Sequence, residues 1–205
     1  MHLFTTTRTV APGRTGEALA FAVTAARDIE TASGLAVSAW INVYGAPPDT
    51  ITFAACARSR AAIGDAFSLL QQGDGVRLVG RTGTDAIGEV VAHTGRGRGG
   101  PAFAAIVTAQ CEPGRVADAI AWTVDTSNDI ARLADLRTLV VRELYGPWAT
   151  VSRITLAPTL ADLDGAEQNL PTDLRHLEHV DECAGWFVPG SVHQRLVRRL
   201  GTDVR

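Results

Sequence analysis

Apolar and polar residues along the first half of the chain predict the order β-α-β-β-α-β. Residues 2–10 are rich in Thr, Phe and Val and predict a strand, which a Pro-Gly pair ends. The same pattern predicts strands at 36–44 and 50–57, a helix at 60–72 and a further strand or pair of strands between 76 and 92. The first helix spans 15–31, because apolar residues recur there with near-helical spacing at Leu19, Val23, Ala26 and Ile29.

The second half repeats this order and then adds elements of its own. Its counterparts are strands at 104–111, 137–145 and 150–157, and helices at 114–134 and 160–169. A further helix is predicted at 171–183 and a short strand at 186–188. A basic helix with Ser191 at its N-cap is predicted at 191–200.

A constant offset relates the two halves. Pro12, Asp28 and Tyr44 recur 101 residues later as Pro113, Asp129 and Tyr145, with no gap between them. Fixed spacing over about 35 residues indicates a tandem duplication. Because β-α-β-β-α-β is the order of a ferredoxin-like unit, we predict an α+β protein of two such units. Unit 1 is placed at 1–93, a Gly/Arg-rich linker at 94–101 and unit 2 at 102–205.

The linker has two readings. Its glycines are typical of flexible chain between domains. A phosphate-binding loop is the sharper alternative, but the segment lacks the Lys and the Ser or Thr of a Walker motif.

Composition narrows the function classes. A formal net charge of −3 gives no indication of a nucleic-acid partner. No apolar run approaches the ~20 residues that span a bilayer, and the first residues do not resemble a signal peptide, so a cytoplasmic protein without a membrane partner is expected.

Two residue types exclude particular chemistries. Cys56, Cys111 and Cys183 are scattered, so no zinc finger or redox dithiol is predicted. The chain contains no lysine, which excludes Schiff-base catalysis and covalently bound pyridoxal phosphate within it.

Four short motifs stand in the second half of the chain: Glu112-Pro113-Gly114-Arg115, Tyr145-Gly146-Pro147-Trp148, Leu160-Ala161-Asp162-Leu163-Asp164 and Phe187-Val188-Pro189-Gly190-Ser191. Together with the predicted order they resemble the dimeric α+β barrel superfamily, and the second half is most similar to its NIPSNAP-like branch. The resemblance covers most of 104–200 and, more faintly through the repeat, 3–93. It implies that a tandem chain closes a pseudo-symmetric α+β barrel within itself, and it leaves a homodimer open. Relatives include cofactor-independent monooxygenases and polyketide cyclases of antibiotic biosynthesis.

Strand alternation selects candidate cavity residues. Trp40, Asn42 and Tyr44 fall on one face of their strand, while small aliphatic residues fall on the other and suit packing beneath helices. The offset places Glu143 and Tyr145 at the equivalent positions of the second half. An apolar wall with a few polar groups is typical of a ligand cavity. The alternative is that both tyrosines are buried core residues with satisfied hydroxyls.

Glu143 and Tyr145 are the predicted catalytic pair, as general base and oxyanion donor. The alternative for Glu143 is a structural ion pair, for example with Arg153. Trp122 and Arg153 complete the predicted substrate-binding set by residue type alone, since oxygenases of the superfamily line their pockets with Asn, Trp, Tyr and Arg. Trp122 has core packing in its helix as the alternative.

No metal or other cofactor is predicted. Asp173, His176, His179 and Cys183 share one helical face and have ligand chemistry, but the acidic residues around them favour a solvated surface.

The predicted function is a small-molecule enzyme, a cofactor-independent monooxygenase or cyclase acting on a hydrophobic aromatic or polyketide-like substrate. The alternative is a non-catalytic barrel that binds a small ligand or a partner protein. The interior discriminates them, because an enzyme requires a cavity of a few hundred Å³ and a structural module has a filled core.

Overall fold

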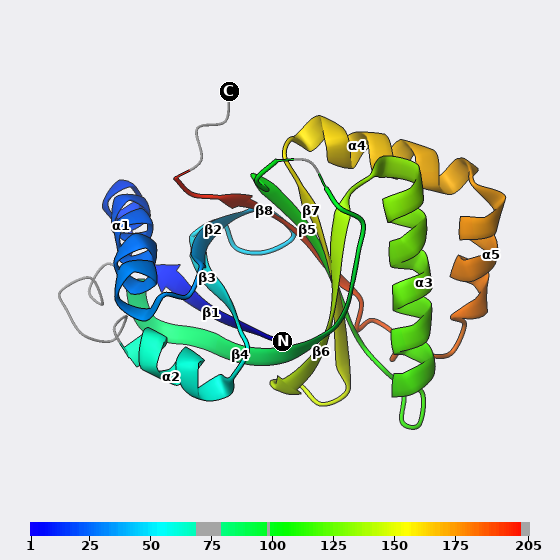
Figure 1. The fold of residues 1–205 in the computed structure, drawn as a ribbon, viewed down its shortest axis with the longest axis horizontal. Helices are drawn as coiled ribbons and strands as arrows, with labels where there is room; N and C mark the ends of the chain where they lie inside the picture. Colours follow the sequence, from blue (N-terminus) through cyan, green and yellow to red (C-terminus); the bar gives the residue numbers. More distant parts are fainter. Residues whose placement is uncertain (69–78, 98, 202–205) are drawn as a thin grey trace.

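Strands of the two halves close into one antiparallel barrel in this computed structural model, which describes residues 1–68, 79–97 and 99–201 (Figure 1). Around the barrel the order is β1-β3-β2-β8-β5-β7-β6-β4. The strands are β1 (His2–Val10), β2 (Val37–Tyr44), β3 (Thr50–Ala57), β4 (Val79–Thr94), β5 (Phe103–Gln110), β6 (Arg137–Tyr145), β7 (Thr150–Ala157) and β8 (His193–Arg199).

Helices cover the outside of the barrel in two groups. In Figure 1, α1 and α2 lie against the strands of the first half, and α3, α4 and α5 lie on the other side. The described helices are α1 (Thr15–Ser33), α2 (Arg60–Ser68), α3 (Val116–Ala134), α4 (Leu160–Asn169) and α5 (Leu174–Glu182). The chain is therefore an α+β barrel, and none of its described helices is long and apolar enough to cross a membrane.

Alternation along the strands separates an outer from an inner face. Ala39 and Phe53 point outward into an apolar cluster, where the small residues of α1 let that helix approach the sheet closely. The opposite faces of the same strands point into the barrel. The side chains of Trp40 and Ala54 therefore bound its interior. The prediction that the aliphatic set of β2 packs beneath a helix is confirmed for Val37 and Ala39.

The prediction of a basic helix at 191–200 is wrong, because residues 193–199 form β8. This strand pairs with β2 on one side and with β5 on the other. Arg195, Val197 and Arg199 all line the interior. Every second residue therefore points inward, as expected for a strand. Without β8 both neighbouring strands would expose unpaired backbone groups, so barrel closure overrides the local helical pattern.

Two other boundaries differ from expectation. The predicted strand at 186–188 is reduced to a single bridge between Phe187 and Cys111. The helix predicted at 60–72 is seen as α2 up to Ser68, and its remainder lies outside the described residues, as does the start of the strand predicted between 76 and 92. The other helices and strands occur within a few residues of their predicted ranges.

Candidate functional site

A cavity of about 700 Å³ lies within the barrel. It is lined by the inner faces of strands from both halves, which is why no single segment of the sequence defines it. Its walls are mainly apolar, with Leu3, Trp40, Ala54, Ala104, Ile106, Leu139, Ile154, Leu156 and Val197.

Charged residues interrupt this apolar lining. The linker contributes Gly95, Arg96 and Pro101 to it, so these residues of the linker form part of the site. The other charged lining residues are Glu30, Arg137, Arg195 and Arg199. An apolar space with a few convergent polar groups is the usual form of a small-molecule site.

Trp40 lies in the wall of this cavity, as its strand alternation predicted. The side chain is 8% exposed and packs with Ala104 and Val197. Its Nε1 donates a hydrogen bond to Ser38 Oγ at 2.8 Å, which fixes the plane of the indole. A rigid aromatic wall of this kind suits a planar apolar ligand.

Glu143 lies on the inner face of β6, beyond the residues that line the cavity. Its Oε2 is shielded from solvent and meets no hydrogen-bond partner among the described residues. A Cβ at position 146 would collide with this oxygen, so a larger residue there would require the Glu143 carboxylate to move. Arg142, its neighbour, is bound instead to Glu89 at 2.6 Å.

Arg195 faces Glu143 across the interior. Burial raises the pKa of Glu143, and the positive charge of Arg195 partly opposes this. Burial likewise lowers the pKa of Arg195, and Glu143 partly restores it. The two groups influence each other without forming an ion pair within 4 Å among the described contacts. A carboxylate whose pKa is raised by burial accepts a proton more readily than one in water.

The remaining residues of the predicted first-half set lie away from the cavity. Asn42 is buried and its side-chain nitrogen is bound to Thr50 Oγ1 and the Pro47 carbonyl in the β2–β3 turn. Tyr44 is 70% exposed at the end of β2. Asn42 therefore holds the turn together, and Tyr44 projects from the end of the barrel.

Tyr145 is separated from Glu143 in the same way. It is 56% exposed, and its hydroxyl accepts a hydrogen bond from Arg60 Nη1 at 2.8 Å. The Arg60 guanidinium also lies over the ring, 5.7 Å from its centroid. The structure thus joins β6 to α2 through Tyr145 and does not bring its hydroxyl to the cavity.

Trp122 and Arg153 both lie outside the barrel. Trp122 belongs to α3, and Arg153 lies beneath that helix. Trp122 Nε1 donates to the His179 carbonyl, and the indole meets Phe187 edge to face at 5.5 Å. Arg153 points from the outer face of β7 to Thr126 Oγ1, 3.4 Å away, and burial lowers its pKa. Neither residue lines the cavity.

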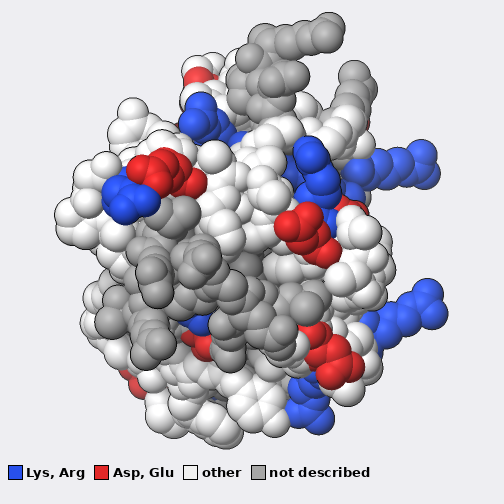
Figure 2. Space-filling model, turned by 90° about the vertical axis from the view of Figure 1, so that its left-hand side faces the viewer, with Lys and Arg blue, Asp and Glu red and all other residues white. Residues whose placement is uncertain are grey.

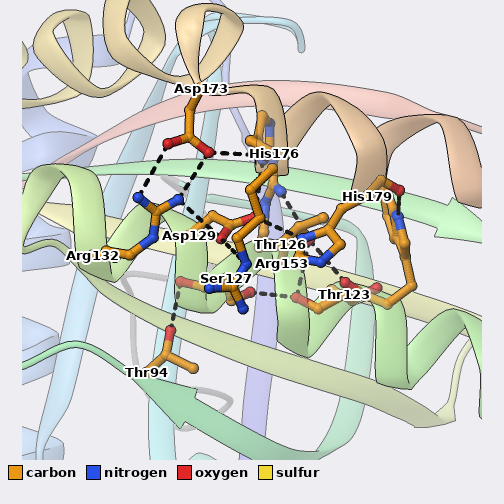
Figure 3. Close-up of polar contacts among 12 residues, drawn as sticks. Thr94, Thr123, Thr126, Ser127, Asp129, Arg132, Arg153, Asp173, His176 and His179 are labelled. Atoms are coloured by element: carbon orange, nitrogen blue, oxygen red, sulfur yellow. Dashed lines mark hydrogen bonds and ion pairs between the residues drawn. The ribbon is translucent and has the colours of Figure 1, made fainter.

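A buried carboxylate, Asp129, organises the contact between α3 and α5 (Figure 3). Its side chain is 2% exposed, and its Oδ2 lies 2.8 Å from His179 Nδ1 and 3.5 Å from His176 Nδ1. Its Oδ1 lies 3.3 Å from Arg132 Nη2. Burial alone would raise the pKa of Asp129, but the hydrogen bonds from His179 and Arg132 outweigh it and hold the pKa below its usual value.

The residues considered as metal ligands are engaged in other contacts. Asp173 binds Arg132 and caps α5 through the His176 amide, and Cys183 Sγ donates to the Val180 carbonyl. No group of His, Cys, Asp or Glu in the described part of the chain is arranged to hold a metal ion.

Sequence reasoning missed the cavity arginines. Arg195 and Arg199 were assigned to a helix, where their spacing of four marks a surface face rather than a strand interior. Arg137 begins the strand whose alternation selected Glu143, so the same period would have placed it inside.

On the outer face that carries α1, basic and acidic side chains are intermingled (Figure 2).

Comparison with known proteins identifies the fold. No family model and no curated protein matches the chain. A proposed monooxygenase from Lactobacillus acidophilus NCFM matches with a TM-score of 0.69 at 11% identity, over 97% of this chain and 93% of that one. A proposed monooxygenase from Fusobacterium nucleatum gives 0.72 at 7% identity, over 97% and 92%. An anthrone oxidase-like protein gives 0.65 at 12% identity, over 98% and 94%. These likenesses confirm the predicted α+β barrel.

Proposed function

We propose that this protein is a small-molecule enzyme of the monooxygenase type, which oxidises a hydrophobic aromatic or polyketide-like substrate inside the barrel without a bound cofactor. The observation that carries the proposal is the cavity of about 700 Å³ with its apolar walls and inward-facing polar groups. A purely structural barrel of eight strands is filled by its own side chains. The likeness to monooxygenase-type barrels supports the reaction class at the level of the fold.

The proposed oxidation balances without a further reductant. A methylene carbon flanked by aromatic rings becomes a carbonyl. One atom of dioxygen enters the product, and the other leaves as water with the two methylene hydrogens. The substrate supplies all the electrons, so a cofactor is not required by the stoichiometry.

Trp40 and Arg195 take their proposed roles from lining the cavity, and Glu143 takes its role from facing Arg195 across the barrel interior. Trp40 forms the wall against which the substrate rings stack. Glu143 removes the proton that activates the methylene, because burial raises the pKa of its carboxyl. Arg195, the cavity residue facing Glu143, stabilises the resulting anion. Tyr145 remains in the proposal only if its contact with Arg60 opens when substrate binds.

The chain's ancestry is part of the proposal. We infer two ferredoxin-like units, at 1–93 and 102–205, that arose by tandem duplication. The support is the constant offset of 101 residues together with the strand order, in which β4-β1-β3-β2 and β8-β5-β7-β6 follow each other around the barrel. The NIPSNAP-like motifs of the second half support its placement in that branch.

Turnover of an anthrone tests the function. We expect the metal-free protein to consume dioxygen and form the quinone at a rate on the order of 10²-fold or more above the spontaneous oxidation, the scale set by one positioned general base. The measurement is oxygen uptake with product analysis, and the control is Arg198→Met, which removes an exposed outward arginine of β8. Binding of the anthrone without oxygen uptake or conversion would assign the non-catalytic alternative.

A further inference from the structure

Positive charge is concentrated in the cavity in a way that the proposed oxidation does not require. The lining contains Arg96, Arg137, Arg195 and Arg199, with Glu30 as the acidic residue among the lining residues described. The chain as a whole has a formal net charge of −3, so the lining is opposite in sign to the protein. A concave, low-dielectric surface of one sign concentrates ligands of the other sign.

Arg137 is the central residue of this charge. It begins β6, where it pairs with Leu156 of β7, and its side chain is half-buried. Its Nε is shielded from solvent and has no hydrogen-bond partner among the described residues, and no ion pair within 4 Å is found for it there. A shielded donor without a partner costs folding free energy, so such a group calls for an explanation outside the fold.

The linker is held against Arg137. Thr94 Oγ1 donates to the Ser127 carbonyl of α3 at 3.0 Å, which anchors the start of the linker. A Cβ at Gly97 would lie 3.1 Å from the Cβ of Arg137, so the linker backbone passes directly over the base of that side chain. Arg96, between the two anchored points, also lines the cavity. The Gly-rich sequence thus lets the chain pass close to Arg137 and supplies a second guanidinium.

The apolar part of the cavity begins one layer further in. Leu139, the next inward residue of β6, lies about 7 Å along the strand from Arg137 at ~3.3 Å per residue. Leu139, Trp40 and Ile154 line the space there. A molecule with an anionic group at Arg137 would therefore extend its apolar body over Trp40 and toward Arg195.

We propose that the cavity takes a hydrophobic acid, whose oxyanion group, a carboxylate or a phosphate, is held by Arg137 and Arg96 where the linker crosses the barrel. This rests on the proposed function for the identity of the cavity as the substrate site, and it names the class of substrate. The planar guanidinium of arginine binds both oxyanions through two parallel hydrogen bonds.

Binding of matched probes tests this without turnover. Anthracene carboxylate, anthracenylmethyl phosphate and anthracenylmethanol share one apolar body and differ in the polar group. We expect the preferred anion to bind about 10- to 100-fold more tightly than the alcohol, the range expected for hydrogen bonds to a charged group. Arg137→Met should abolish the preference, Arg137→Lys should retain part of it, and the outward control Arg198→Met should retain all of it.

The possible outcomes are distinct. A preference for one of the two anions that Arg137→Met removes supports the proposal and identifies the group. Equal binding of acid and alcohol by the wild type overturns it, even if an anthrone is turned over. Binding of the acid without any oxidation leaves the anion site standing and contradicts the proposed function instead. If Arg137→Met does not fold, Arg96→Met in the exposed linker serves as the second variant, and an unchanged preference in that variant contradicts the proposal.

Discussion

Glu143→Gln is expected to lower the turnover number by about 10²–10⁴-fold, the contribution of a positioned general base. Glutamine keeps the shape of the side chain but cannot accept the proton. The melting temperature should not fall, because Glu143 forms no ion pair within 4 Å among the described residues and its shielded Oε2 has no hydrogen-bond partner there. Turnover of the substrate and thermal melting of the same variant check both expectations.

The matched control is Glu89→Gln on the neighbouring strand β4. Glu89 is partly exposed and accepts a hydrogen bond from Arg142 at 2.6 Å on the outside of the barrel. A partly exposed pair of this kind contributes about 0–1 kcal/mol to stability, so this variant should stay folded. It should also retain its activity, because Glu89 lies on the outside of the barrel. Full activity of Glu143→Gln with a large loss of stability would end the proposal that Glu143 is the base.

Asp129→Ala is expected to destabilise the fold by about 3 kcal/mol, the lower end of the range for removing one partner of a buried ion pair. His176 and His179 would lose the carboxylate that they share, whereas Arg132 would keep Asp173 at 2.9 Å. For a chain of this length the change corresponds to roughly 6–12 °C in melting temperature. Denaturant unfolding measures it, with the exposed Asp118→Ala as the control. An equal effect of the two variants would contradict the role of Asp129.

The same cluster predicts the response of stability to acid. Hydrogen bonds from His179 and Arg132 hold the pKa of Asp129 below its usual value in the folded state, despite the opposing effect of burial. The stabilisation is therefore fully present above the unfolded value of about 3.9 and is lost as pH falls through the lower, folded value. Asp129→Ala should consequently show a shallower loss of stability on acidification below about pH 4 than the wild type.

Much of the fold was predictable because local pattern and tertiary contacts agree in most segments. The strands at 50–57 and 137–145 and the helix at 160–169 have the predicted bounds. The last of these begins with Thr159 and Asp162 in a reciprocal capping box, a signal that is wholly local. The prediction of a helix at 191–200 was wrong because the structure of residues 193–199 is decided by two strands far away in the sequence.

The glycines of the repeated Tyr-Gly motif illustrate what pattern alone misses. A Cβ at Gly45 would collide with the Gln194 carbonyl of β8, and one at Gly146 would collide with the Glu143 carboxylate. At position 45 the obstacle is backbone, so glycine is required there, whereas at position 146 the obstacle is the end of a side chain that can move aside. The motif suggested a functional tyrosine in each half, whereas the close contacts of the described structure involve the glycine beside it.

The candidate site was only partly predictable for a related reason. Alternation along β2 identified Trp40 as a cavity residue, since period two within one strand needs no tertiary information. It could not show that Tyr44 and Tyr145 lie at strand ends that extend beyond the cavity. Trp122 and Arg153 were selected by residue type, and residue type does not show whether a side chain points into the barrel or away from it.

Filling the cavity tests the central claim most directly. Ala54 lies on the inner face of β3 and lines the cavity, so Ala54→Phe places a ring in the substrate space. The same change at the exposed Ala61 of α2 is the control. Oxygen uptake with an anthrone should be lost in Ala54→Phe and retained in Ala61→Phe, with both variants folded by circular dichroism. Undiminished uptake by a folded Ala54→Phe protein would contradict the claim that the barrel interior is the site of the reaction.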